Sequence, residues 1–138
     1  MQQFEVINIL KKDLNFSDYS IELLKEFTNL VLKENKSHNL IAKSTENQIW
    51  LRHILDSAQL VKFIDFNSNS LADLGTGAGF PGLVVAIFNK NKAFHVKLYE
   101  KSPVKRKFLV RVIEKLRLNA EVLGDIRYEK LNSNIIIC

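Results

Sequence analysis

The chain has 138 residues, of which 46% are hydrophobic, and a formal net charge of +5. This length supports one domain with its own core, and no apolar run approaches the roughly 18 residues that a membrane span needs. The N-terminus has no basic segment followed by an apolar stretch, so the sequence indicates no signal peptide. The lone Cys138 excludes an internal disulfide framework and fits a reducing cytoplasm.

The positive charge is concentrated in the second half of the chain. Residues 1–70 carry eight Lys/Arg and nine Asp/Glu, whereas residues 71–138 carry twelve and six, which gives net charges of −1 and +6. Seven of these basic residues fall between Lys101 and Arg117. Such a density favours a polyanionic partner, RNA or DNA, although a solvated helix face can show the same pattern.

Residues 1–66 predict an N-terminal helical segment. Apolar residues recur at three- and four-residue steps within 4–14 and 20–34, which predicts two helices, the second capped by either Ser17 or Asp18. The pair Thr45 and Gln48 has the spacing of a capping box and predicts a further helix that ends near residue 63. Residues 65–70 are polar and form the linker into the second part of the chain.

The most informative stretch is residues 73–82, D-L-G-T-G-A-G-F-P-G, between two apolar runs. This order predicts a strand, a glycine-rich turn and a helix, the unit with which α/β folds hold nucleotides. A dinucleotide loop has glycine where this chain has Phe80. The carboxylate of Asp73 would repel a pyrophosphate but attract the ammonium and sulfonium groups of S-adenosylmethionine. The loop, through Gly75 and Gly77, therefore favours S-adenosylmethionine over NAD and over a turn that only packs a helix on a strand.

The rest of the chain extends this unit. A strand over 93–99 ends at Glu100, about twenty residues beyond the loop, where such folds place the carboxylate that binds the ribose hydroxyls. Ser102 and Pro103 then begin a helix that reaches about residue 117, and short strands follow at 120–123 and 135–138. We therefore expect an α/β fold, an incomplete Rossmann-like methyltransferase sheet of about four strands over residues 67–138. The alternative is a small complete four-stranded domain.

Several segments, in this order, resemble the bacterial small-subunit ribosomal RNA guanine-N7 methyltransferases, also called glucose-inhibited division protein B. The two motifs R-H-x-x-D-S and G-x-G-x-G-F-P-G together are a specific signal for this family, whereas either motif alone would be a weak signal. The matching segments are residues 39–40, 52–57, 73–82, 100–102, 105–109 and 127–129.

The resemblance implies methylation of N7 of one guanine in small-subunit ribosomal RNA, with S-adenosylmethionine as methyl donor. It implies cofactor contacts at Gly75 and Phe80, and contacts to the adenine at Tyr128 and Glu129. Asp125 is a rival for the adenine contact. The family also has an arginine just after the fourth strand, a position that would follow residue 138.

The expected chemistry needs no catalytic side chain. Guanine N7 has an in-plane lone pair and no proton to remove, so positioning can carry most of the catalysis. The cations expected to contact RNA are Arg52, His53, Lys101, Lys105, Arg106, Lys107 and Arg111. For His53 and Asp56 a hydrogen-bonded staple between helix and sheet is an equal or better interpretation. We predict no metal site, because the three histidines do not cluster and one cysteine completes no ligand set.

Two other functions stay open at this point. The chain could be a non-catalytic, truncated remnant of such an enzyme, and in that case residues 1–138 alone would be inactive and only marginally soluble. An NAD-dependent oxidoreductase is the weaker alternative. For the methyltransferase we expect a cytoplasmic protein with ribosomal RNA or a ribosomal subunit as partner, no membrane, and a monomeric state if the full-length fold is complete.

Overall fold

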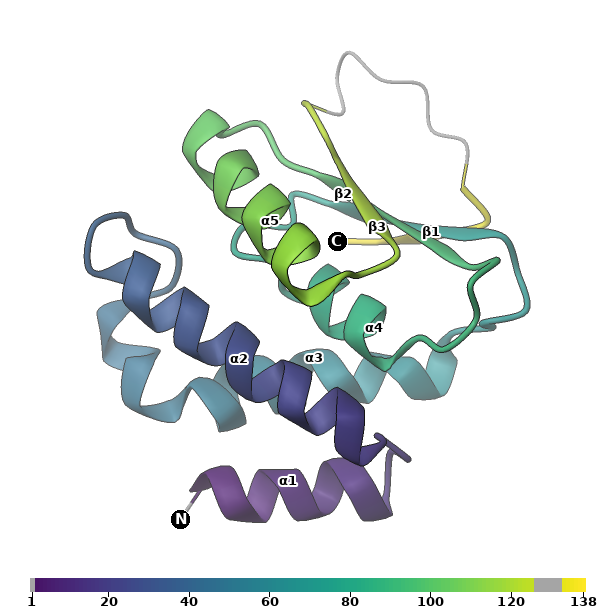
Figure 1. Cartoon of the computed structure of the whole chain (residues 1–138), viewed down its shortest axis with the longest axis horizontal. Helices are drawn as coiled ribbons and strands as arrows, with labels where there is room; N and C mark the ends of the chain where they lie inside the picture. The colour runs from purple at the N-terminus through teal and green to yellow at the C-terminus, as the bar shows by residue number, and fades with distance from the viewer. Residues whose placement is uncertain (1, 126–132) are drawn as a thin grey trace.

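The computed structural model describes residues 2–125 and 133–138 and shows an α/β fold with one parallel sheet (Figure 1). The strands are β1 (Ser70–Leu74), β2 (His95–Tyr99), β3 (Ala120–Leu123) and β4 (Ile135–Ile137). They lie in the order β3-β2-β1-β4, and every pair is parallel. The predicted four-stranded sheet with preceding helices is confirmed. The strand order reverses direction at β1, and ligands of open α/β sheets bind at such a reversal, outside the carboxyl ends of the strands.

Two helices connect the first three strands. Helix α4 (Gly82–Phe88) joins β1 to β2, and α5 (Pro103–Leu116) joins β2 to β3. Because both connections move in the same direction along the sheet, right-handed crossovers place both helices on one face. The predicted cap of α5 is confirmed: the Ser102 hydroxyl accepts a hydrogen bond from the Lys105 N–H. Arg117 ends the helix in the left-handed conformation, at φ +55°.

The N-terminal segment begins with two regular helices, α1 (Gln2–Lys12) and α2 (Asp18–Asn35). Of the two caps considered for α2, the structure selects Ser17, whose hydroxyl accepts a hydrogen bond from the Ser20 N–H at 3.0 Å. The Ser20 hydroxyl in turn donates to the carbonyl of Ile87 at 2.9 Å. This buried hydrogen bond fastens α2 to the end of α4.

Residues 43–63 do not form the single α-helix that the capping-box pattern predicts. They form a 3₁₀ helix η1 (Lys43–Gln48), a π-helical stretch η2 (Trp50–Leu55), a short α3 (Asp56–Ala58) and a second 3₁₀ helix η3 (Gln59–Phe63). The Thr45 hydroxyl does not cap a helix, because it donates to the carbonyl of Ala42 at 2.8 Å. The prediction of a regular helix was wrong because burial of the apolar side chains outweighs regular backbone hydrogen bonding here. In η2 alone, Trp50, Ile54 and Leu55 are buried.

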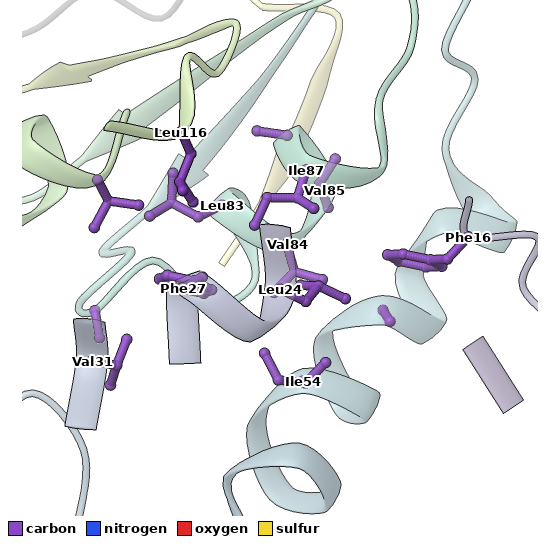
Figure 2. Packing of buried hydrophobic residues seen from close by; sticks show 14 of the residues in the cluster. Phe16, Leu24, Phe27, Val31, Ile54, Leu83, Val84, Val85, Ile87 and Leu116 are labelled. Carbon is purple, nitrogen blue, oxygen red and sulfur yellow. The ribbon is translucent and has the colours of Figure 1, made fainter. Parts of the chain in front are cut away.

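The sheet and the helical segment share one hydrophobic cluster. Figure 2 shows Leu24 from α2, Ile54 from η2 and Val84 from α4 gathered in it. All three side chains are fully buried. The cluster therefore crosses the expected boundary near residue 66. Among the described residues, no helix has both the length and the apolar character needed to cross a membrane.

Candidate functional site

The glycine loop follows β1 and is held across the end of β2. Gly75, Gly77 and Gly79 have φ of +74°, +60° and +105°, values that glycine adopts without the steric cost other residues incur. The Tyr99 carbonyl accepts hydrogen bonds from the N–H groups of Gly75 at 2.9 Å and Thr76 at 3.1 Å. The strand, glycine turn and helix expected from the sequence thus form one connected unit.

Asp73 lies buried beneath this loop. Its Oδ2 accepts a hydrogen bond from the Gly82 N–H at 2.9 Å, and the residue is 1% exposed. A Cβ at position 82 would collide with Leu98 and would lie 2.7 Å from Asp73 Oδ2. The carboxyl therefore fixes the first turn of α4, and only glycine fits at that turn.

Burial raises the pKa of Asp73 to about 6, and the nearby charge of Glu100 adds to this rise. The Thr76 side chain and the Gly82 N–H oppose it with smaller effects. The Thr76 hydroxyl is close enough to lower the pKa, although the two groups do not meet with hydrogen-bond geometry. Asp73 Oδ1 and Thr76 Oγ1 are both buried without a hydrogen-bond partner among the described residues.

A cavity of about 330 Å³ opens at the carboxyl ends of β1, β2 and β3. Its lining residues are Gly75, Gly77, Tyr99, Glu100, Lys101, Lys105 and Asp125. A Cβ added at Gly75 or Gly77 would meet nothing within 4 Å. The absence of side chains at these two positions thus keeps the space open, at the lower end of the volume range of small-molecule sites.

Glu100 connects the glycine loop to the start of α5. Its Oε1 accepts a hydrogen bond from the Gly77 N–H and its Oε2 from the Ser102 N–H, each at 2.9 Å. The residue is buried yet lines the cavity. Each carboxylate oxygen can accept a further hydrogen bond, so the predicted contact to ribose hydroxyls remains compatible with this arrangement.

Phe80 belongs to the packing between loop and helical segment. Its ring centroid lies 5.2 Å from that of Phe27 and 5.1 Å from that of His53. The His53 Nε2 is 2.9 Å from the Thr45 hydroxyl, and burial lowers the pKa of the imidazole. Phe80 does not line the cavity, so a contact between this residue and the cofactor stays a prediction. The His53 hydrogen bond stays within the helical segment, and its imidazole reaches the loop only through the ring contact with Phe80, whereas the neighbouring Arg52 is exposed.

Three residues were considered for the adenine contact, and only Asp125 belongs to the described residues. Asp125 follows β3 and lines the cavity, as a carboxylate for the adenine should. Tyr128 and Glu129 lie outside the described residues, so the choice between Asp125 and Glu129 stays open.

The basic residues of α5 divide into two groups. Arg106 donates through Nη1 to the carbonyls of Glu100 at 2.9 Å and Lys101 at 2.7 Å. Arg111 forms an ion pair with Glu34 of α2 at 2.7 Å. Arg106 therefore ties the start of α5 to the segment after β2, and Arg111 links α5 to α2 at the surface. Lys107 is exposed and makes no ion pair within the described part of the chain.

Sequence reasoning missed three lining residues of the cavity. Lys101 and Lys105 were expected only as RNA contacts, and Tyr99 was not singled out. The signal was available for all three, because Tyr99 and Lys101 flank Glu100 and Lys105 lies in the first turn of the following helix. The lysines therefore join the cavity to the basic face of α5.

The sheet order, the glycine loop and the carboxylate after β2 define a Rossmann-like fold, which methyltransferases share. A solved structure with this fold, a protein-L-isoaspartate O-methyltransferase, superposes with a TM-score of 0.60 at 16% identity, covering 98% of this chain and 47% of that one. Coclaurine N-methyltransferase gives 0.50 at 17% identity, covering 97% and 47%.

The chain belongs to the GidB family, ribosomal RNA small subunit methyltransferase G, whose model matches residues 20–138. The relative from Pelagibacter ubique is 42% identical over 117 residues, which are 80% of this chain and 55% of that protein. The relative from Rickettsia felis is 40% identical over 120 residues, 86% of this chain and 60% of that protein. The chain thus spans little more than half the length of these relatives.

Proposed function

We propose that this chain carries the S-adenosylmethionine site of an enzyme that methylates N7 of a guanine in small-subunit ribosomal RNA. The observation that carries the proposal is the cavity at the carboxyl edge, where two bare glycines face two carboxylates, in a chain of the GidB family. A basic helix begins at the same cavity. We further propose that the protein acts in the cytoplasm, on ribosomal RNA or a ribosomal subunit.

The residues present fit S-adenosylmethionine. Gly75 and Gly77 leave room for backbone approach, and Glu100 and Asp125 offer acceptors for ribose hydroxyls and for the adenine amino group. NAD would place its pyrophosphate at the start of the helix after the loop. Here the Gly82 N–H at that start is already bonded to Asp73 Oδ2. A carboxylate in that position repels a phosphate, which disfavours the oxidoreductase alternative.

When bound, S-adenosylmethionine supplies an electrophilic methyl group. The residues of this chain would orient the two reactants, since guanine N7 can attack without losing a proton. Glu100 holds the loop in the shape that the cavity requires, and Lys101 and Lys105 place positive charge beside it. Phosphates next to the target guanine could rest on these lysines.

We expect the chain to bind S-adenosylhomocysteine more tightly than NADH. The physical reason is the start of α4, where the Gly82 N–H that a pyrophosphate would use is already bonded to the Asp73 carboxylate. Calorimetric titration of the 138-residue chain with each ligand measures the difference. Tighter binding of NADH would contradict the methyltransferase proposal.

Binding and turnover need separate measurements, because the chain spans little more than half of its curated relatives. Transfer of a radiolabelled methyl group to small ribosomal subunits, with the Pelagibacter ubique relative as positive control, tests turnover directly. Ligand binding without transfer would favour the non-catalytic remnant over a complete catalyst.

We expect Lys105 and Lys107 to contact RNA phosphates. A plot of log binding constant against log salt concentration has a negative slope. For duplex RNA, replacing both lysines with Ala should make this slope shallower by about two, because each lost phosphate contact removes roughly one released counterion. Replacing the exposed Lys36 and Lys62 is the charge-matched control. Arg106 is left unchanged because its loss would disturb the fold. Equal slopes in the two double variants would show that the basic face of α5 is only solvated.

A further inference from the structure

A second cavity of about 410 Å³ lies at the opposite edge of the sheet. It is bounded by the N-terminal end of α2, the C-terminal ends of α4 and α5, and the segments that enter β2 and β3. Helix α5 runs antiparallel to the strands (Figure 1). Lys105 in its first turn lines the first cavity, and Leu116 at its end lines this one. The 14 residues of the helix span about 21 Å.

Three cations surround this second cavity. Lys90, Lys92 and Arg117 are exposed lining residues, and none of them forms an ion pair with any residue in 2–125 or 133–138. No Asp or Glu is among the lining residues. The nearest acid along α2, Asp18, pairs with Lys11 at 2.8 Å. The lining of the cavity is therefore positively charged, and no Asp or Glu of the described chain is paired with the three cations.

The segment that presents the lysines is held in a fixed shape. Asn89 Nδ2 donates to the carbonyls of Asn91 and Phe94 at 3.0 and 3.1 Å, and Asn91 Nδ2 donates to the carbonyl of Phe66 at 2.8 Å. Asn119 Nδ2 donates to the carbonyl of Lys92 at 3.0 Å. The backbone beneath the lysine side chains therefore needs no ordering when a ligand arrives, which lowers the entropic cost of binding.

An exposed aromatic ring completes the cavity. Tyr19, in the first turn of α2, lines it and is 69% exposed. Cations beside an exposed aromatic ring are the elements of single-stranded nucleic-acid sites, in which bases stack on rings and phosphates rest on Lys and Arg.

We infer that this amino-edge cavity is a second RNA-docking site, where Lys90, Lys92 and Arg117 bind phosphates and Tyr19 stacks with an unpaired base. The inference rests on the proposed function, because it takes RNA as the partner. It assigns the enzyme a contact remote from the methyl-donor cavity. The basic side chains of α5 lie between the two sites, so one RNA can follow the helix from one cavity to the other.

The first experiment measures binding of a fluorescein-labelled 15-nucleotide single-stranded RNA to the 138-residue chain by fluorescence anisotropy, over a range of salt concentrations. The triple variant Lys90→Gln, Lys92→Gln, Arg117→Gly should make the slope of log binding constant against log salt concentration shallower by about two, at roughly 0.7 per lost phosphate contact. Glycine is chosen at 117 because the residue there has φ +55°. The triple variant Lys12→Gln, Lys36→Gln, Lys62→Gln removes the same charge outside the cavity and should leave the slope within about half a unit of the parent's.

The second experiment tests the aromatic contact at constant salt. Tyr19→Ala should weaken RNA binding at least about fivefold through lost stacking, and Tyr19→Phe should keep the parent affinity. Polyglutamate serves as a polyanion without bases, and its binding should be the same for Tyr19→Ala and the parent chain.

Three results would overturn the inference. Equal salt slopes for the two triple variants would show that Lys90, Lys92 and Arg117 make no phosphate contacts, and an unchanged affinity of Tyr19→Ala would show that no base stacks on its ring. The third is that the parent chain binds no RNA, which would also remove RNA as the partner in the proposed function, whereas the S-adenosylmethionine site is tested separately by the ligand titration. If the slope changes with Lys105 and Lys107 replaced but not with the amino-edge triple, the inference fails and the proposed function stands.

Discussion

Gly77→Val is expected to abolish binding of S-adenosylhomocysteine, with a loss of at least about a hundredfold in affinity, which corresponds to roughly 2.7 kcal/mol. A side chain at this position projects into open space beside the cavity, where the ligand has to lie. The φ of +60° also disfavours a β-branched residue. Calorimetric titration of the variant and the parent measures the loss.

A matched control distinguishes a loss of affinity caused by the blocked cavity from one caused by backbone strain. Asn15 has φ +61° and is exposed away from the glycine loop. Asn15→Val therefore imposes a comparable strain of about 1–3 kcal/mol without entering the cavity. We expect both variants to lose similar stability in urea unfolding, while only Gly77→Val loses the ligand. Wild-type affinity in Gly77→Val would place the methyl-donor site elsewhere.

Asp73→Asn is expected to stabilise the chain at neutral pH by up to about 3 kcal/mol, because it removes a buried charge. The pKa of Asp73 is raised from 3.8 to about 6, so the folded state binds the proton more tightly than the unfolded state. The stabilising effect of that proton is complete below about pH 4 and is lost as the pH rises through 6. The amide that replaces the carboxyl can still accept the hydrogen bond from the Gly82 N–H. Because it carries no charge, the variant does not lose stability as the pH rises through 6.

Urea unfolding between pH 4 and pH 8 checks the prediction. The difference in free energy of unfolding between Asp73→Asn and the parent should grow with pH across this window and level off above pH 7. Asp13→Asn is the control, because it makes the same substitution at an exposed aspartate just after the end of α1. A constant difference at all pH values would mean that Asp73 is not the group that titrates near 6.

A buried charge that costs stability suggests a functional reason for keeping it. The Asp73 carboxylate lies under the loop that borders the cavity, and its negative charge favours a cationic ligand above it. Stabilising substitutions at functional sites commonly reduce activity. Asp73→Asn should therefore weaken binding of S-adenosylmethionine, which carries the sulfonium charge, more than binding of S-adenosylhomocysteine.

The local signals in the sequence predicted the local structure around the cavity. The predicted glycine turn does join β1 to α4, Ser102 does cap α5, and Glu100 does follow β2. Each of these follows from short-range chemistry, a glycine in a turn or a hydroxyl before a helix. Such features depend on neighbours within a few positions.

The features that the sequence did not predict depend on partners far along the chain. The sequence did not predict the ion pair of Arg111 with Glu34, 77 positions away. It also did not predict the hydrogen bond from the Gly82 N–H to Asp73 Oδ2, which depends on the close approach of α4. The irregular path of residues 43–63 likewise reflects packing against α1 and α4, which no local pattern encodes.

The anchoring of the glycine loop has a consequence for the kinetics and thermodynamics of ligand recognition. Hydrogen bonds to the Tyr99 carbonyl and the Glu100 carboxylate fix the loop without any ligand. The conformational entropy of this segment is therefore lost during folding and not during association. A preorganised loop of this kind leaves the interaction energy of the ligand available as affinity. Amide hydrogen exchange at Gly75, Thr76 and Gly77 should accordingly be slow already in the free protein.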